Sequence, residues 1–67
     1  MTAANVSVVT ESELERIIRW RSEELERAGY EPEGAAALAA RLDIDLHEAI
    51  DLVKSGCPHE IAVRILL

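Results

Sequence analysis

The side chains that could do chemistry gather in the second half of the chain. Cys57, His47 and His59 supply one sulfur and two imidazoles. Three carboxylates lie near them in sequence: Asp43, Asp45 and Asp51. A structural zinc site takes four ligands, usually as Cys-x2-Cys and His-x3-His pairs. The pairs present are Cys57-x-His59 and His47-x3-Asp51. Neither has that spacing, so we expect no zinc site.

Asp43-x-Asp45-x-His47 resembles the first ligands of a calcium loop. Such a loop requires a glycine at its sixth position and a bidentate glutamate at its twelfth. Glu48 and Lys54 stand at those two positions. The pattern therefore predicts no calcium site.

A cysteine nucleophile needs a nearby base that a third group orients within a cleft. Cys57 and His59 are close in sequence, but Pro58 between them is expected to begin a helix and to direct the two side chains apart. Four short helices also leave little room for a pocket of roughly 300 Å³. We therefore predict a protein that is not an enzyme, with no catalytic residues, no cofactor and no small-molecule substrate.

The composition predicts one small acidic helical domain. The chain has 67 residues, of which 49% are hydrophobic and 3% aromatic, and its net charge is −6. Such a charge repels phosphate backbones and anionic membrane surfaces. The single cysteine cannot form an internal disulfide, so no covalent staple compensates for the small size. A lone thiol is also typical of a reducing compartment.

The sequence shows no signal for secretion or membrane insertion. Residues 1–9 contain no Lys or Arg, and they lack the run of roughly 7–15 apolar residues of a secretory signal. No segment reaches the roughly 18 apolar residues of a membrane span. We expect a cytoplasmic protein in which residues 1–9 form a flexible tail and residues 10–67 form the helical domain.

The first helix is predicted at about residues 11–28. Thr10, with Glu13 three residues later, has the pattern of an N-terminal capping box. Apolar residues then recur with helical spacing on one face: Leu14, Ile17, Ile18, Leu25 and Ala28. Arg21 lies on the same face, where its stem can pack while its guanidinium stays in water. Gly29 is expected to end the helix, with Tyr30 packing back on it.

Three shorter helices are predicted at about residues 32–42, 46–55 and 58–66. Pro32 and Pro58 suit helix starts, and Asp45 suits an N-cap, with Ile44 placed to pack on Ala49. Short loops between these helices make neighbours turn back on each other. The fold class is therefore all-α: a small orthogonal four-helix domain with helix-turn-helix-like packing after a loose N-terminal tail.

The core-facing residues of the second and fourth helices follow from helical spacing. In the second they are mostly small: Ala35, Ala36, Leu38, Ala39 and Leu42. In the fourth they are larger: Ile61, Ala62, Ile65 and Leu66. Gly34 weakens the second helix by up to about 1 kcal/mol relative to alanine. We expect this helix to depend on tertiary contacts.

Leu38-Ala39-x-x-Leu42-x-Ile44-Asp45, followed by Ala49 and Leu52, resembles a helix-turn-helix. In that motif the second helix, here residues 46–55, enters the major groove. Its outward positions are mainly acidic or neutral: Asp45, His47, Glu48, Asp51 and Lys54. Phosphate neutralisation supplies much of the affinity for DNA, and these outward positions carry the wrong charge for it. The resemblance therefore indicates how the helices pack rather than DNA binding. A helix-turn-helix-type, nucleic-acid-associated regulator is kept as the alternative function.

Two further resemblances concern the loop after the first helix and the chain as a whole. Leu25-Glu26-Arg27-Ala28-Gly29-Tyr30 resembles ubiquitin-associated domains, which implies a docking surface formed by Tyr30 and the last helix. Residues 14–67 are similar to a group of short uncharacterised bacterial proteins, which implies domain boundaries but no activity. The shared pattern is Ala28-Gly29-Tyr30, Asp43-Ile44-Asp45-Leu46-His47-x-Ala49, Gly56-Cys57-Pro58 and Ala62-x-Arg64-Ile65-Leu66.

Apolar side chains that the core does not use are the remaining candidates for function. Trp20 lies beside the apolar face of the first helix. It either closes the edge of the core, the more common use of a single tryptophan, or stands exposed as a binding anchor. Val63 and Leu67 make the last helix apolar on too many sides for solvent. We predict a module for interaction with a protein partner or for self-association. The candidate partner-binding residues are Trp20, Tyr30, Val63, Leu66 and Leu67.

Overall fold

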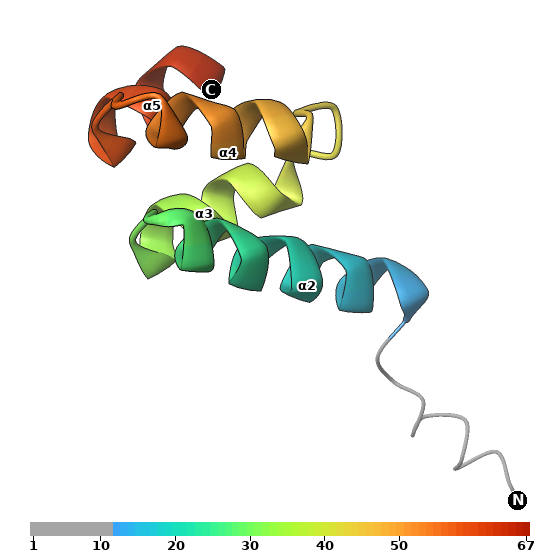
Figure 1. Cartoon of the computed structure of the whole chain (residues 1–67). Coiled ribbons are helices and arrows are strands. Elements are labelled where there is room, and N and C mark those ends of the chain that lie inside the picture. The colour runs from blue at the N-terminus through green and yellow to red at the C-terminus, as the bar shows by residue number, and fades with distance from the viewer. Residues whose placement is uncertain (1–11) are drawn as a thin grey trace, which may run out of the picture.

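Residues 12–67, the part of the chain that the computed structural model describes, form an all-α fold. The elements are α2 (Glu13–Ala28), α3 (Pro32–Ala40), α4 (Leu46–Lys54) and α5 (His59–Leu66). Helices α3 and α4 are central, because α2 packs on both of them and α5 packs on both of them (Figure 1). The predicted fold class, a small all-α domain of four helices, is thus confirmed. The predicted tail, residues 1–9, lies outside the described residues.

Helix α2 begins later than the sequence predicted, because Ser12 caps it instead of Thr10. The Ser12 hydroxyl accepts a hydrogen bond from the Glu15 backbone N–H at 3.1 Å, and the Glu15 carboxylate accepts one from the Ser12 N–H at 3.0 Å. Thr10-x-x-Glu13 and Ser12-x-x-Glu15 have the same capping-box spacing. The structure shows the second pair, with Ser12 as the N-cap of α2, whereas Thr10 lies outside the described residues.

Helices α2 and α4 end in the same way. For α2, the sequence predicted this ending at Gly29. The Tyr30 N–H donates to the Leu25 carbonyl at 3.1 Å, and the Gly29 N–H donates to that of Glu26 at 3.0 Å. The equivalent bonds after α4 join Cys57 to Leu52 and Gly56 to Val53, both at 3.1 Å. Both glycines have positive φ, +127° and +103°, which L side chains rarely adopt. Each is a Schellman motif.

Helix α3 is shorter than the predicted helix 32–42, which changes the residues that it buries. Arg41 has extended backbone angles, φ −92° and ψ 93°, and it ends the helix. Leu42 lies beyond the end of the helix and is exposed. Ala36 lies within the helix and is exposed as well, although both residues were predicted to face the core. Ile44, from the turn after α3, is buried instead. The turn thus supplies the apolar side chain that a longer helix would have supplied.

Helices α4 and α5 lie within one residue of their predicted bounds. Asp45 is the N-cap of α4, as predicted, and its carboxylate accepts from the His47 N–H at 2.9 Å. Pro58 stands at the N-cap position of α5, so the helix itself begins at His59. The short turn between α4 and α5 brings these two helices into contact; α5 also packs on α3, and α4 also packs on α2.

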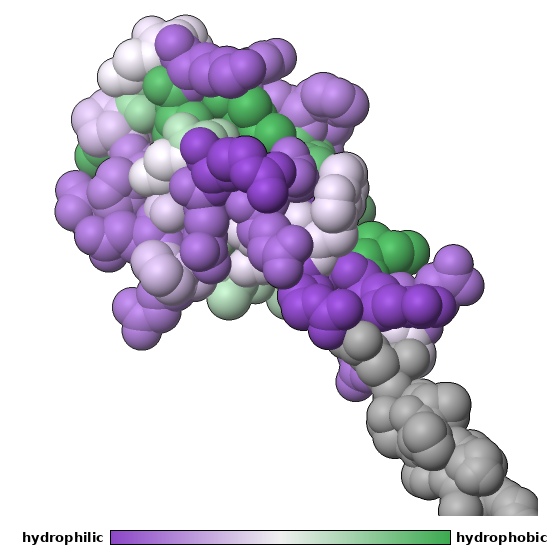
Figure 2. Space-filling model, turned by 60° about the horizontal axis from the view of Figure 1, so that its bottom comes forward, coloured by the Kyte–Doolittle hydropathy of each residue, from purple (hydrophilic) through white to green (hydrophobic). Residues whose placement is uncertain are grey.

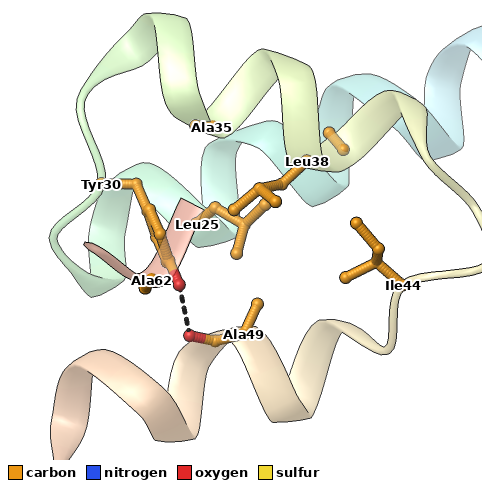
Figure 3. Packing of buried hydrophobic residues seen from close by; sticks show 8 residues of the cluster. Leu25, Tyr30, Ala35, Leu38, Ile44, Ala49 and Ala62 are labelled. Atoms are coloured by element: carbon orange, nitrogen blue, oxygen red, sulfur yellow. Dashed lines mark hydrogen bonds between the residues drawn. The ribbon is translucent and has the colours of Figure 1, made fainter. Parts of the chain in front are cut away.

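The core is small and aliphatic, and Tyr30 is its one polar anchor. The buried cluster contains Leu25, Tyr30, Ala35, Leu38, Ala39, Ile44, Ala49 and Ala62. Figure 3 shows these side chains directed toward one another from all four helices and the turns between them. The Tyr30 hydroxyl donates to the Ala49 carbonyl at 2.7 Å, across the core. A buried hydroxyl needs such a partner, since leaving it unbonded is costly.

The contact between α3 and α5 depends on Gly34. A Cβ at this position would meet the Cγ2 atom of Val63 at 3.0 Å, closer than side chains normally pack. The absence of a side chain at Gly34 therefore lets the two helices approach. This contact is the tertiary support that the sequence led us to expect for α3.

The inward face of α5 differs from the predicted one. Ala62 is buried and Val63 and Leu66 are partly buried, whereas Ile61 and Ile65 are exposed. The prediction placed Ile61 and Ile65 in the core and Val63 outside it. Val63 turns inward because Gly34 leaves space for it, and this rotation turns the two isoleucines toward solvent.

Candidate functional site

The N-terminal turns of α2 extend beyond the rest of the helical domain (Figure 1). We call residues 13–20 the projecting end of α2. Within it, Ile18 is partly buried and the other residues are exposed, whereas Leu25 further along the same helix is completely buried. The apolar face of α2 therefore continues past the point where the core ends.

Arg21 marks that point. Its Nε donates to the Ala39 carbonyl at 3.2 Å, and its Nη2 donates to the carbonyls of Arg41 at 3.2 Å and Ile44 at 2.8 Å. The sequence suggested that this guanidinium would stay in water. It instead binds the last turn of α3 and the turn that follows, whose carbonyls have no partner within a helix. Because α3 stops here, residues 12–67 cover the apolar side chains of α2 that precede Arg21 only in part. Ile18 packs at the edge of the core, whereas the other apolar side chains are about half exposed.

Three of those side chains form one row, which we call the docking face: Leu14, Ile17 and Trp20. They are 49%, 43% and 53% exposed. Their spacing of three residues places them next to one another along the helix surface. Figure 2 shows one face of the molecule, on which hydrophilic side chains dominate and hydrophobic surface is confined to separate patches. Because Trp20 is more than half exposed, it does not close the core, which is the use that the sequence favoured for it.

The other predicted partner-binding residues do not join this row. Tyr30 is buried, with its hydroxyl bonded to Ala49, so its ring belongs to the core and cannot form a docking surface with the last helix. Val63 and Leu66 are partly buried and pack against the core, while Leu67 is half exposed at the end of α5. Leu14 and Ile17 were predicted to be core residues, so sequence reasoning missed them as surface candidates.

The side chains considered for chemistry are spread over the molecule. Cys57 lies in the turn after α4, with its Sγ 3.6 Å from the Pro58 carbonyl oxygen. His47 is exposed in the first turn of α4, where its Nδ1 is 3.9 Å from a carboxylate oxygen of Asp45. Within residues 12–67, no three His, Cys, Asp or Glu side chains are grouped as a metal ion would require.

A shallow groove of about 230 Å³ lies between the C-terminal ends of α2 and α4. Its lining residues are Glu24, Arg27, Ala28, Ile50 and Lys54. Glu24 and Arg27 form an ion pair with each other along α2. Neither Cys57 nor a histidine lines this groove.

The outward side of α4 and the turn before it carry negative charge. Asp45, His47, Glu48 and Asp51 are all exposed there. In the same turn, Arg41 donates to both carboxylate oxygens of Asp43, at 3.0 and 2.9 Å. These hydrogen bonds hold the pKa of Asp43 below its ordinary value. Asp43 is therefore ionised and paired with Arg41, and the excess negative charge of this surface comes from Asp45, Glu48 and Asp51.

No protein-family model, curated protein or solved structure matches this chain. Among the helices of residues 12–67, none is both long enough and apolar enough to span a membrane.

Proposed function

We propose that this protein is a protein-interaction module that binds its partner through the docking face of α2. The observation that carries the proposal is the exposure of Leu14, Ile17 and Trp20 in one row on a helix that extends beyond its own core. Tryptophan is enriched among the residues that dominate binding energy, and such anchors are surrounded by smaller apolar contacts. Leu14 and Ile17 provide that surrounding.

The chemistry of the face suits an apolar contact more than a charged ligand. The neighbouring residues carry both signs: Glu13, Arg16 and Glu24. A face with mixed charges at its rim and apolar side chains at its centre has the usual composition of a protein interface. Helix-in-groove recognition likewise relies on anchors spaced three or four residues apart.

A photo-crosslinking experiment in living cells tests the proposal. The photoreactive amino acid p-benzoylphenylalanine is placed at Leu14 of the full chain, and the cells are irradiated. We expect one covalent adduct of defined mass, identified by mass spectrometry, and its loss when Trp20→Ala is added. The matched control carries the same amino acid at Glu26, which is exposed on nearly the opposite side of α2, and should give no adduct. Absence of any Trp20-dependent adduct at position 14 would overturn the proposal.

A further inference from the structure

The charge of the chain is distributed so that two copies can meet at the projecting end of α2. The whole chain has a net charge of −6, but the projecting end, residues 13–20, contains two acids and two bases, a net charge of zero. Helix α4 with its N-cap, residues 45–54, by contrast contains three acids and one lysine, a net charge of −2. Contact between two copies through α4 would oppose two acidic surfaces, whereas contact through the projecting end avoids that repulsion.

The docking face also has the symmetry that a twofold contact needs. Ile17 stands at the centre of the row, with Leu14 on one side and Trp20 on the other, each three residues away. In a twofold contact the same patch serves both copies, so a residue i that touches j is matched by j touching i. Two antiparallel α2 helices with their axis beside Ile17 place each Leu14 opposite the Trp20 of the other copy, a small side chain against a large one.

We infer that the partner of the docking face is a second copy of this chain, bound antiparallel through α2 with the twofold axis beside Ile17. This inference rests on the proposed function and names its partner. A nearly neutral face offers a charged partner little electrostatic gain, while it spares two acidic copies their repulsion. Helix α5 is the other candidate face, because it also has nearly balanced charge and exposes Ile61 and Ile65. It lacks an aromatic anchor and does not project.

The dimer is expected to be weak and to tighten with salt. A stable interface uses roughly 20–30 residues on each side, many more than the projecting end offers. We expect a dissociation constant on the order of 100 µM. Two copies of net charge −6 repel each other outside the contact, and salt screens that repulsion. Binding to a partner of opposite charge would instead weaken as salt is added.

Sedimentation equilibrium of the purified full chain tests the inference. The wild type, Ile17→Asp and Ile65→Asp are compared from 10 µM to 1 mM at 50 and 500 mM NaCl. We expect the wild type and Ile65→Asp to dimerise, several-fold more tightly at the higher salt, and Ile17→Asp to remain monomeric. Circular dichroism checks that both variants keep their helices. Ile65→Asp is the matched control, because it places the same charge on an exposed isoleucine of α5.

A disulfide test locates the axis. In a Cys57→Ser background, a cysteine at position 17 should meet its own copy across the axis and form a disulfide-linked dimer under mild oxidation. A cysteine at position 26, on the opposite side of α2, should not. Preferential crosslinking at position 26 would overturn the inferred geometry.

The outcomes separate this inference from the proposed function. A wild-type chain that stays monomeric at 1 mM in 500 mM NaCl overturns the second copy as partner. So does a dimer that Ile65→Asp breaks and Ile17→Asp does not. If the adduct at position 14 in cells then joins a different protein, the proposed function stands and only the identity of its partner is wrong. If no adduct forms in cells either, both proposals fall.

Discussion

Arg21 satisfies three backbone carbonyls with one side chain. Its acceptors belong to the last turn of α3 and to the turn before α4. A positive charge near the C-terminal end of a helix also interacts favourably with the helix dipole. The planar guanidinium presents several N–H donors in a fixed fork, and this geometry lets Arg21 bind carbonyls that lie on different residues.

Arg21→Lys should therefore destabilise the fold although it keeps the charge. A lysine ammonium is a compact donor that cannot reproduce the fork, so at least one carbonyl loses its partner. We expect the free energy of unfolding in urea to fall by about 1–2 kcal/mol. Arg16→Lys, on the exposed side of α2, should have almost no effect. Equal effects of the two substitutions would show that the bonds of Arg21 contribute little.

Tyr30→Phe isolates the hydrogen bond that joins Tyr30 to Ala49 across the core. The ring remains and only the hydroxyl that donates to Ala49 is removed. We expect a loss of about 1 kcal/mol in unfolding free energy at neutral pH, measured by urea titration. An unchanged midpoint would contradict the role given to this bond.

The same tyrosine should make the fold sensitive to alkali. Burial, together with the nearby Cys57, raises the pKa of Tyr30 above its ordinary value. Below about pH 10 the phenol is protonated in both the folded and the unfolded chain. Above that pH the unfolded chain releases the proton first, so this contribution to stability is lost as pH rises through the raised pKa. The urea midpoint should fall between pH 9 and pH 11, and the fall should be smaller in Tyr30→Phe.

At the scale of the helices, the features that the sequence predicted well are those set by local chemistry. Gly29 and Asp45 act through hydrogen bonds to residues within five positions of themselves, so their roles are readable from short patterns. The capping box shows the limit of such patterns, because Thr10-x-x-Glu13 and Ser12-x-x-Glu15 have the same spacing and the pattern alone does not choose between them.

Features that depend on how the helices meet were not readable from the sequence. Helical spacing placed Leu14 and Ile17 on the core side of α2, and that direction is correct. Their exposure follows from the short length of α3, which stops opposite Arg21. The prediction of the inward face of α5 was wrong for a similar reason, since the space left at Gly34 decides which side of α5 turns inward. Because the sequence placed Leu14 and Ile17 in the core, it identified Trp20 as a candidate for binding but not these two neighbours.

The fit between α3 and α5 can be tested with a double-mutant cycle. Gly34→Ala gains up to about 1 kcal/mol in helix propensity, but its Cβ would meet Val63 at 3.0 Å. We expect a net loss of about 1 kcal/mol in unfolding free energy, because overpacking outweighs propensity. In a Val63→Ala background the same substitution should become neutral or stabilising. Additive effects would show that the two positions are not coupled.

At the scale of the whole molecule, the acidic surface makes a prediction about nucleic acids. The exposed side of α4 carries Asp45, Glu48 and Asp51, and the net charge of the chain is −6. Without phosphate neutralisation there is little non-specific affinity. We expect no change in the fluorescence anisotropy of a labelled DNA duplex at 50 mM salt with up to 100 µM protein. Binding that weakens steeply with added salt would instead favour the helix-turn-helix alternative.

The Ser12 capping box has a consequence for motion within α2. The helix is held at its start by the bonds between Ser12 and Glu15 and in its second half by burial of Leu25, whereas residues 16–20 have little tertiary cover. Segments with few buried contacts open at lower free energy than the core. Amide protons of residues 17–20 should thus exchange with deuterium much faster than those of residues 24–28. Raising the protein concentration should slow this exchange only if a second molecule occupies the uncovered turns.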